Sequence, residues 1–387
     1  MDSLILLDYD TLRHIWWLLL GVLLIAFAVM DGADLGVAML LPLVAKTDDE
    51  RRVLYNVIGP VWEGNQVWLI LAGGVVFAAW PLLYAMSFSG FYLAMMLLLV
   101  ALILRPVAIK YRSKLTSVKW RQNWDITWCL TGVVAALVFG VAIGNVMLGV
   151  PFRFEHDTLR PIYEGSFFGL FMPFALLCGV LSVAMMALQG AVVLGWKTEG
   201  EIARLSKRWA LISGSVVIAL FLLGGFFIAN SVTGYALDTS LLPAHEASNP
   251  LLAAKAVAVE KGAWMYNYGL APMMWIAPAL GVIGALLAMA LVGRGGGLVA
   301  VVMSSISIAG VILTFGFSTY PFLLPSSLEP AASLTLFDAS ASHFTLWIML
   351  LISAVFLPLI IAYTSWVYRV MRGKVTEDSV NDAPHAY

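Results

Sequence analysis

Long apolar runs, separated by short polar segments, fill the chain from residue 14 to residue 369. Nine runs reach the roughly 20 residues that a helix needs to cross the hydrocarbon core of a membrane. Residues 53–105 are too long for one span, and the stretch "AAWPLLY" divides them at a predicted turn. The predicted helices are 14–42, 53–79, 82–105, 124–149, 166–196, 206–230, 264–292, 298–323 and 343–369.

This pattern predicts an all-α polytopic membrane protein. Residues 1–370 are expected to form one transmembrane helical domain, followed by a cytoplasmic tail at 371–387. The composition agrees, because 61% of the residues are hydrophobic and only 12% are charged, whereas about a quarter of a soluble domain is charged. The net charge of −1 provides no basic field for a nucleic acid. We therefore expect contact with membrane lipid and no nucleic-acid partner.

The lysines and arginines are concentrated in alternate connections between the predicted helices. Most of the 22 lie in the first, third, fifth and seventh connections and in the C-terminal tail. Because cytoplasmic segments carry the excess of basic residues, the N-terminus is predicted to be periplasmic and the C-terminus cytoplasmic. That orientation requires an odd number of spans, which agrees with nine.

Three acidic residues lie inside apolar runs, where an unpaired charge costs several kcal/mol. Asp31 and Asp34 occur in "AVMDGADLGVAML", and their i, i+3 spacing places both on one face of a helix. Glu63 occurs in "VIGPVWEGNQVWLILAGGVVFAAW". An ionisable residue within a membrane helix indicates a functional site.

The depths of these residues in the membrane are predicted to be similar. At 1.5 Å per residue, Asp31 lies roughly 24 Å along the first helix, and Glu63 lies roughly 15 Å along the second, which runs in the opposite direction. Arg105 ends the third helix at the same side. The three carboxylates and the guanidinium are thus predicted to share the cytoplasmic half, either as a proton path or as a structural ion cluster.

The neighbours of Glu63 allow two interpretations each. Asn65 and Gln66 suit hydrogen bonds between helices, or they belong to the same proton path. Trp62 and Trp68 suit packing, or they line a path for quinone or gas.

The sequence shows no pattern of metal or haem ligands. It contains no CxxCH, and no two histidines have the helical spacing of ligands. We therefore predict no metal site and no covalently bound cofactor in this chain. The histidines considered are His14, His156, His245 and His343.

Several longer motifs resemble those of subunit II of the cytochrome bd ubiquinol oxidase family, a family that includes the cyanide-insensitive oxidases. The combination of DGxDLG and GNQVWL is the most specific part, and the similarity extends over almost the whole chain. The motifs are "IWWLLLGVLLIAFAVMDGADLGV", "GPVWEGNQVWLILAGGVVFAAWP", "SFSGFYLAMMLLLVALILRPV", "YRSK" and "YPFLLPSS".

The resemblance implies a nine-helix subunit of the bacterial cytoplasmic (inner) membrane. Its partner would be a similarly folded subunit I that carries haem b and haem d and oxidises quinol, commonly with a small single-helix subunit. The complex would reduce dioxygen to water with protons taken from the cytoplasm. Subunit II would support haem assembly and the access of protons and oxygen, and would sometimes hold a structural ubiquinone.

The motif positions of the family in this chain are Asp31, Asp34, Glu63, Asn65, Gln66 and Arg105. Family members often have Asp where this chain has Glu63, so the carboxylate is retained here with one additional methylene group. Two other functions stay open at this point. The same acids would suit a proton-coupled secondary transporter, although no inverted repeat is visible. The chain would also suit a purely structural assembly subunit.

Overall fold

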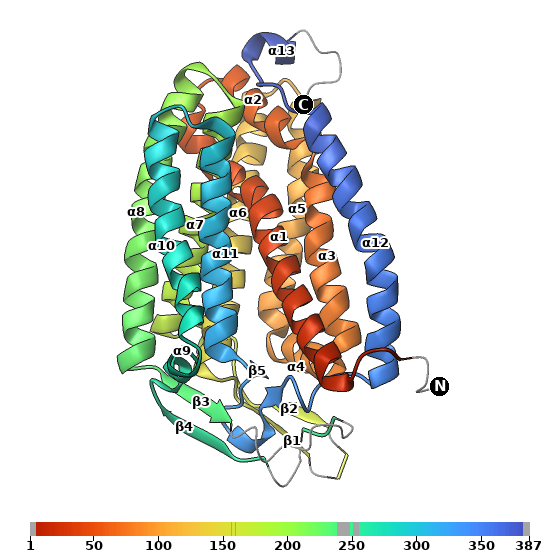
Figure 1. Ribbon diagram of the computed structural model, residues 1–387. Coiled ribbons are helices and arrows are strands. Elements are labelled where there is room, and N and C mark those ends of the chain that lie inside the picture. The colour runs from red at the N-terminus through yellow and green to blue at the C-terminus, as the bar shows by residue number, and fades with distance from the viewer. Residues whose placement is uncertain (1–4, 156, 159, 238–247, 251–254, 382–387) are drawn as a thin grey trace.

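The computed structural model describes residues 5–155, 157–158, 160–237, 248–250 and 255–381. Helix α1 lies at the centre of a bundle of long helices and packs against α3, α6 and α7 (Figure 1). Helices α8, α10 and α11 pack on one side of this centre, while α5 and α12 lie on the other. The bounds are α1 (Tyr9–Val44), α3 (Trp62–Ala79), α5 (Tyr92–Tyr111), α6 (Val118–Leu148), α7 (Pro173–Lys197), α8 (Gly200–Asn230), α10 (Ile276–Gly293), α11 (Gly297–Thr319) and α12 (His343–Val370).

Within the described residues, eight helices are long and apolar enough to cross a membrane. A ninth span is formed if α2 (Asp48–Ile58) and α3 are taken together, since they meet at a bend of 49°. The first described residues and the short α13 (Glu377–Asn381) lie at opposite ends of the bundle, as an odd number of spans requires (Figure 1).

Three predicted helices are interrupted in the structure. The helix expected at 53–79 breaks at Gly59–Val61, because Pro60 has no amide hydrogen and its ring opposes a continuous helix. The helix expected at 82–105 is divided at Phe91 into α4 (Pro81–Gly90) and α5. The helix expected at 264–292 begins with the short α9 (Tyr266–Leu270), and its long part starts only after Pro272.

The structure also contains three small antiparallel sheets of two strands each, which the all-α prediction omits. They lie at the end of the bundle where α1 begins (Figure 1). Their strands have only two to five residues within the connections, too few for a periodic signal. The pairs are β1 (Phe152–Phe154) with β2 (Pro161–Tyr163), β3 (Thr233–Leu237) with β4 (Val257–Lys261), and β5 (Phe322–Leu324) with β6 (Leu334–Thr335).

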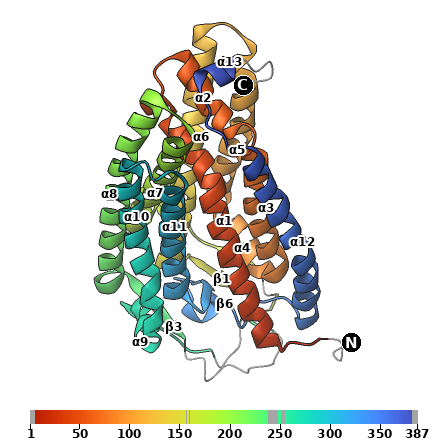
Figure 2. The same ribbon diagram turned by 45° about the horizontal axis from the view of Figure 1, so that its top comes forward.

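The described part of the predicted tail packs against the bundle. The backbone N–H of Val375 donates to the carbonyl of Lys197 at 2.8 Å, and the Lys197 ammonium donates to the carbonyl of Met371. The short α13 (Glu377–Asn381) then contacts α2, with Val380 buried between them (Figure 2).

Candidate functional site

Helix α1 packs closely against α7 because it has glycine where the two backbones meet. A Cβ at Gly36 would overlap the backbone of Met186 and Gly190, and a Cβ at Gly32 would overlap the Met186 side chain. The glycines thus fix the rotation of α1 against α7.

Asp31 and Arg105 form a buried ion pair between α1 and α5. The Asp31 Oδ1 and Arg105 Nη1 atoms are 2.8 Å apart, and both side chains are fully buried. Arg105 also donates a hydrogen bond to Gln66 on α3, with 3.2 Å between Arg105 Nη2 and Gln66 Oε1. The guanidinium carbon also lies 5.8 Å from the centre of the Trp62 ring. Three of the predicted residues, Asp31, Gln66 and Trp62, therefore lie around the Arg105 guanidinium.

Asp34 lies one turn further along α1 and binds an amide instead of a cation. The Asn65 Nδ2 group donates to both carboxylate oxygens of Asp34, at 3.1 and 3.0 Å. The Tyr368 hydroxyl on α12 donates to Asn65 Oδ1 at 2.9 Å. Asn65 thereby connects α1, α3 and α12 through side chains alone.

Glu63, which the sequence predicts to lie in the same half of the membrane as Asp31 and Asp34, makes no contact with this cluster in the structure. Glu63 is exposed, and no hydrogen bond or ion pair joins it to any residue that the structure describes. The reason is its position on α3, because Glu63 and Asn65 are two residues apart and therefore roughly 160° apart around the helix. With Asn65 facing α1, the Glu63 side chain points to the outer surface of the chain.

Tyr368 is a member of the cluster that the sequence does not reveal. It occurs in the last apolar run, near "TSWVYRV", where an aromatic residue suggests an interfacial belt. Only the packing of α12 against α1 and α3 shows that its hydroxyl reaches Asn65.

A second charged network, also unpredicted, lies at the end of the bundle near α2. Asp125 accepts from Arg112 at 2.6 Å and from Arg51 at 3.0 Å. Asp48 accepts from Arg112 at 2.7 Å and from Arg121 at 2.6 Å. Asp48 and Arg51 lie in α2, Arg112 lies in the turn after α5, and Arg121 and Asp125 lie in α6, so the network joins α2 and that turn to the start of α6.

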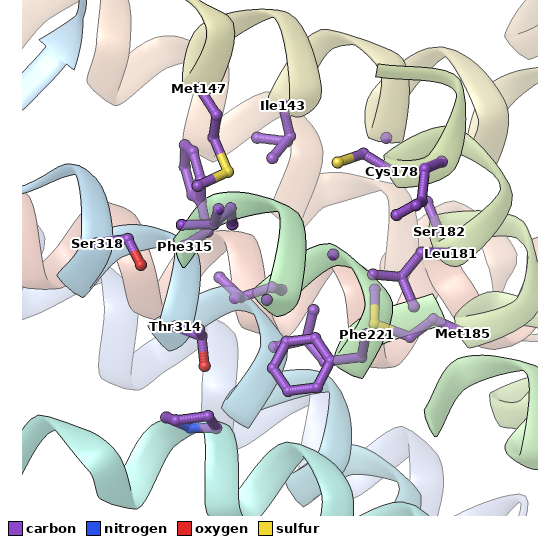
Figure 3. A pocket seen from close by; sticks show the side chains of 18 of the residues that line it. Ile143, Met147, Cys178, Leu181, Ser182, Met185, Phe221, Thr314, Phe315 and Ser318 are labelled. Atoms are coloured by element: carbon purple, nitrogen blue, oxygen red, sulfur yellow. The ribbon is translucent and has the colours of Figure 1, made fainter. Parts of the chain in front are cut away.

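A large apolar cavity of about 520 Å³ lies between α1, α6, α7, α8, α10 and α11 (Figure 3). Its wall is formed mainly by aliphatic, aromatic and sulfur-containing side chains, with Ser182 at one side and Thr314 and Ser318 on α11. Trp62 and Trp68 do not line this cavity. Trp68 instead packs in a small core with Leu23, Phe27 and Ala72.

The described histidines have structural hydrogen bonds at the end that carries the strands. A ring nitrogen of His14 lies 2.8 Å from the Tyr320 hydroxyl, and a ring nitrogen of His343 lies 2.8 Å from the Leu7 carbonyl. His156 and His245 fall outside the described residues. The described residues contain no group of three or more His, Cys, Asp or Glu side chains arranged to hold a metal ion.

Comparison with known proteins gives close relatives over the full length. Residues 12–371 match the family described as cytochrome bd terminal oxidase subunit II. The chain is 44% identical over 381 residues to cytochrome bd-I ubiquinol oxidase subunit 2 of Escherichia coli (strain K12), covering 98% of this chain and 100% of that protein. It is 45% identical over 383 residues to a probable cytochrome oxidase subunit 2 of Haemophilus influenzae, with the same coverage.

The fold has a solved counterpart. It matches a chain in the structure of bd oxidase from Geobacillus thermodenitrificans with a TM-score of 0.69 at 17% identity, covering 93% of this chain and 98% of that one. The described residues form a bundle of eight or nine candidate spans around a buried ion pair, which defines a polytopic membrane protein. With the matches above, the chain belongs to the cytochrome bd terminal oxidase subunit II family, which confirms the resemblance.

The chain is therefore a subunit of a quinol-oxidising terminal oxidase in the inner membrane, with subunit I as its partner. This assignment replaces the transporter alternative. The buried acids therefore belong to a subunit of an oxidoreductase complex and not to a substrate carrier.

Proposed function

We propose that Asp31, Asp34 and Arg105 form part of the path by which the complex takes protons from the cytoplasm for the reduction of dioxygen to water. The charge count of the cluster supports this proposal most directly. The cluster holds two buried carboxylates and one guanidinium, which pairs with Asp31, while Asp34 accepts hydrogen bonds, among the described residues, only from the amide of Asn65. A buried surplus charge is unfavourable, so the cluster is suited to gain and lose one proton.

The proposed orientation places the α2 and α13 end in the cytoplasm and the three small sheets in the periplasm. It rests on the basic residues of the first, third and fifth connections. Asp34 is ten residues from the end of α1, or about 15 Å from the proposed cytoplasmic end. Labelling of Lys114→Cys and Glu164→Cys with a membrane-impermeant thiol reagent tests this orientation, because only Glu164→Cys should react from outside the cell.

Glu63 is proposed to receive or deliver protons at the surface shared with subunit I. A carboxylate that faces lipid is costly, so an exposed Glu63 in the isolated chain favours cover by a partner. The neighbouring α5 and α12 also present large exposed apolar side chains, among them Leu97, Val100, Val355 and Leu359. We therefore assign the face formed by α3, α5 and α12 to subunit I.

The cofactors are proposed to lie in the partner. Haem b and haem d supply the electron transfer and oxygen chemistry of such a complex, and the two described histidines of this chain, His14 and His343, are engaged in hydrogen bonds. The proposed small single-helix subunit would complete the assembly. The access of dioxygen along Trp62 and Trp68 stays a prediction, since neither residue lines the large cavity.

The apolar cavity fits a bound ubiquinone. Its volume of about 520 Å³ lies within the range of small-molecule sites, and Thr314 and Ser318 offer hydroxyl groups beside an otherwise apolar wall. Extraction of quinone from the purified complex tests this proposal. The substitution Ile143→Trp should fill the cavity and lower the quinone content, whereas Ile283→Trp on the exposed side of α10 should leave it unchanged.

The proton proposal is tested by Asp34→Asn, with Asp49→Asn as a charge control, because the Asp49 side chain on α2 is exposed. Quinol-driven oxygen consumption and the haem spectrum of the assembled complex are measured for both. We expect Asp34→Asn to retain haem but slow oxygen consumption by at least about 10-fold, the scale of losing a positioned proton-transfer group. If Asp34→Asn assembles and turns over normally, the cluster is purely structural and the proton proposal is wrong.

A further inference from the structure

We propose that Asn65 and Tyr368 form a positioning pair that allows Asp34 to bind and release a proton while its hydrogen bonds are preserved. This inference rests on the proposed role of Asp34 in proton uptake. It assigns to Tyr368 on the last helix a role in the reaction, although that residue lies outside every motif that identifies the family.

The geometry matches the ionised form of Asp34. Asn65 is almost completely buried, and its amide NH₂ faces both oxygens of the carboxylate. The amide oxygen is turned away and accepts from the Tyr368 hydroxyl. The phenol therefore holds the amide in the orientation that presents hydrogens to a negative charge.

The same two side chains also suit the protonated form. A proton that binds Asp34 makes a carboxylic O–H group, which needs an acceptor in place of a donor. A half-turn of the Asn65 side-chain amide places Oδ1 toward that O–H. The NH₂ group then donates to the Tyr368 oxygen, and the phenolic hydrogen turns away from Asn65. A hydroxyl and an amide each donate and accept, so both states of Asp34 find partners.

Asp31 lacks this freedom, and the contrast identifies Asp34 as the group that changes its protonation state. The cation beside Asp31 is Arg105, whose guanidinium donates hydrogen bonds but accepts none. It therefore supports only the ionised carboxylate. The charged and titratable groups that face Asp34 from the described elements around it are Asp31 on α1, Arg105 on α5 and Tyr368 on α12.

The position of Tyr368 connects the cluster to the outer surface of the chain. Its side chain is half-buried, while most residues of α12 around it are exposed. The phenol thus lies between the buried acids and the face that we assign to subunit I. A change in how subunit I packs on α12 would act on the orientation of Asn65 through this one hydroxyl.

The test compares Tyr368→Phe with Tyr363→Phe in the complete oxidase complex. Both substitutions remove one hydroxyl from α12, but Tyr363 is 40% exposed and its hydroxyl has no hydrogen bond to the described residues. For each complex, quinol-driven oxygen consumption is measured over a range of pH, together with the haem spectrum. Infrared difference spectra between oxidised and reduced enzyme report the protonated carboxyl group, which is assigned by its loss in Asp34→Asn.

We expect Tyr368→Phe to retain haem, to slow turnover by about tenfold at most, as for the loss of one hydrogen bond, and to move the pH at which turnover is half-maximal. It should also shift the infrared band assigned to Asp34. The variant Tyr363→Phe should change neither quantity. An unchanged pH profile and band in Tyr368→Phe would overturn the positioning role.

Two further measurements keep the outcomes distinct. Normal turnover in Asp34→Asn would reject proton uptake through the cluster itself, whereas slow turnover in Asp34→Asn with a normal Tyr368→Phe would reject only the positioning pair. If Tyr368→Phe does not assemble, 3,5-difluorotyrosine at residue 368 preserves the shape of the side chain and makes the phenol more acidic. A pH profile that does not respond to this replacement would also overturn the proposal.

Discussion

Asp31 on α1 and Arg105 on α5 are both inaccessible to solvent, and their nearest charged atoms are 2.8 Å apart. The two residues are more than seventy positions apart in the sequence, and their ion pair joins α1 to α5. A pair of this kind stabilises a fold little compared with apolar side chains of the same size, but removing one partner leaves an unpaired charge. The loss of either charge should therefore destabilise the fold more than the loss of both charges together.

The first prediction separates the structural role of this pair from its role in the reaction. Arg105→Gln alone should destabilise the assembled complex by about 3–5 kcal/mol, because Asp31 then lacks its cation. The double substitution Asp31→Asn with Arg105→Gln removes both charges and should recover much of that loss. Thermal denaturation of the complex, followed by haem absorbance, measures the stability of each variant.

The rate of oxygen consumption is compared for the same variants. If the pair contributes to proton uptake, the double variant should regain stability but not oxygen consumption. Recovery of both quantities together would show that the pair acts only as a connection between helices.

The second prediction concerns Glu63. Because its side chain is exposed and has no hydrogen-bond or ion-pair partner in the described chain, Glu63→Gln should leave the stability of this subunit within about 0.5 kcal/mol of the parent. We expect the complex to contain its haems but to consume oxygen more slowly. Glu63→Asp, which retains the carboxylate, should be less affected. Equal rates in the parent and in Glu63→Gln would remove Glu63 from the proton path.

Much of the bundle follows from the sequence because lipid imposes a simple rule on it. A run of about 20 apolar residues must be helical to satisfy its backbone groups, and the nine predicted spans reflect that rule. Helix rise predicts a similar depth for Asp31, Asp34 and Arg105, and the structure pairs Asp31 with Arg105 while Asp34 lies three residues further along α1.

The sequence does not predict how each helix is rotated about its axis, or which side chains of different helices come into contact. The orientation of Glu63 depends on which face of α3 turns toward α1, and the apolar pattern of this helix does not show that face. Tyr368 joins the cluster only through the packing of α12. Asp125 on α6 contacts Arg51 on α2 and Arg112 in the turn after α5, contacts that residue spacing along one chain segment cannot show.

The third prediction tests the close approach of α1 and α7. Gly36→Ala places a methyl group against the Met186 carbonyl, a backbone atom that can move only if the helices separate. We expect a loss of about 1–3 kcal/mol or more, together with a lower yield of assembled complex. Gly21→Ala on the same helix has open space around it and serves as the matched control. Equal thermal stability of the two variants would contradict the packing role of Gly36.

The fourth prediction concerns a buried ion pair outside the membrane-spanning helices. Lys255 Nζ lies 2.8 Å from Asp338 Oδ2, and both side chains are almost inaccessible. Burial raises the pKa of the Asp338 carboxyl above its ordinary value of 3.8, although Lys255 opposes that rise. Lys255→Met removes the opposing charge, so it should raise the pKa of Asp338 further and leave an unpaired carboxylate at neutral pH.

The sign of the pH dependence follows from that change. Between the ordinary carboxyl pKa and the raised folded-state pKa, the folded protein binds more protons than the unfolded protein, so stability falls as the pH rises through this window. Lys255→Met should therefore lose about 3–5 kcal/mol at neutral pH and regain part of it as the pH is lowered toward 4. Rates of limited proteolysis in the 248–250 and 330–340 segments measure this locally. Lys255→Met with Asp338→Asn is the control, because it lacks the titrating group and should show no such recovery.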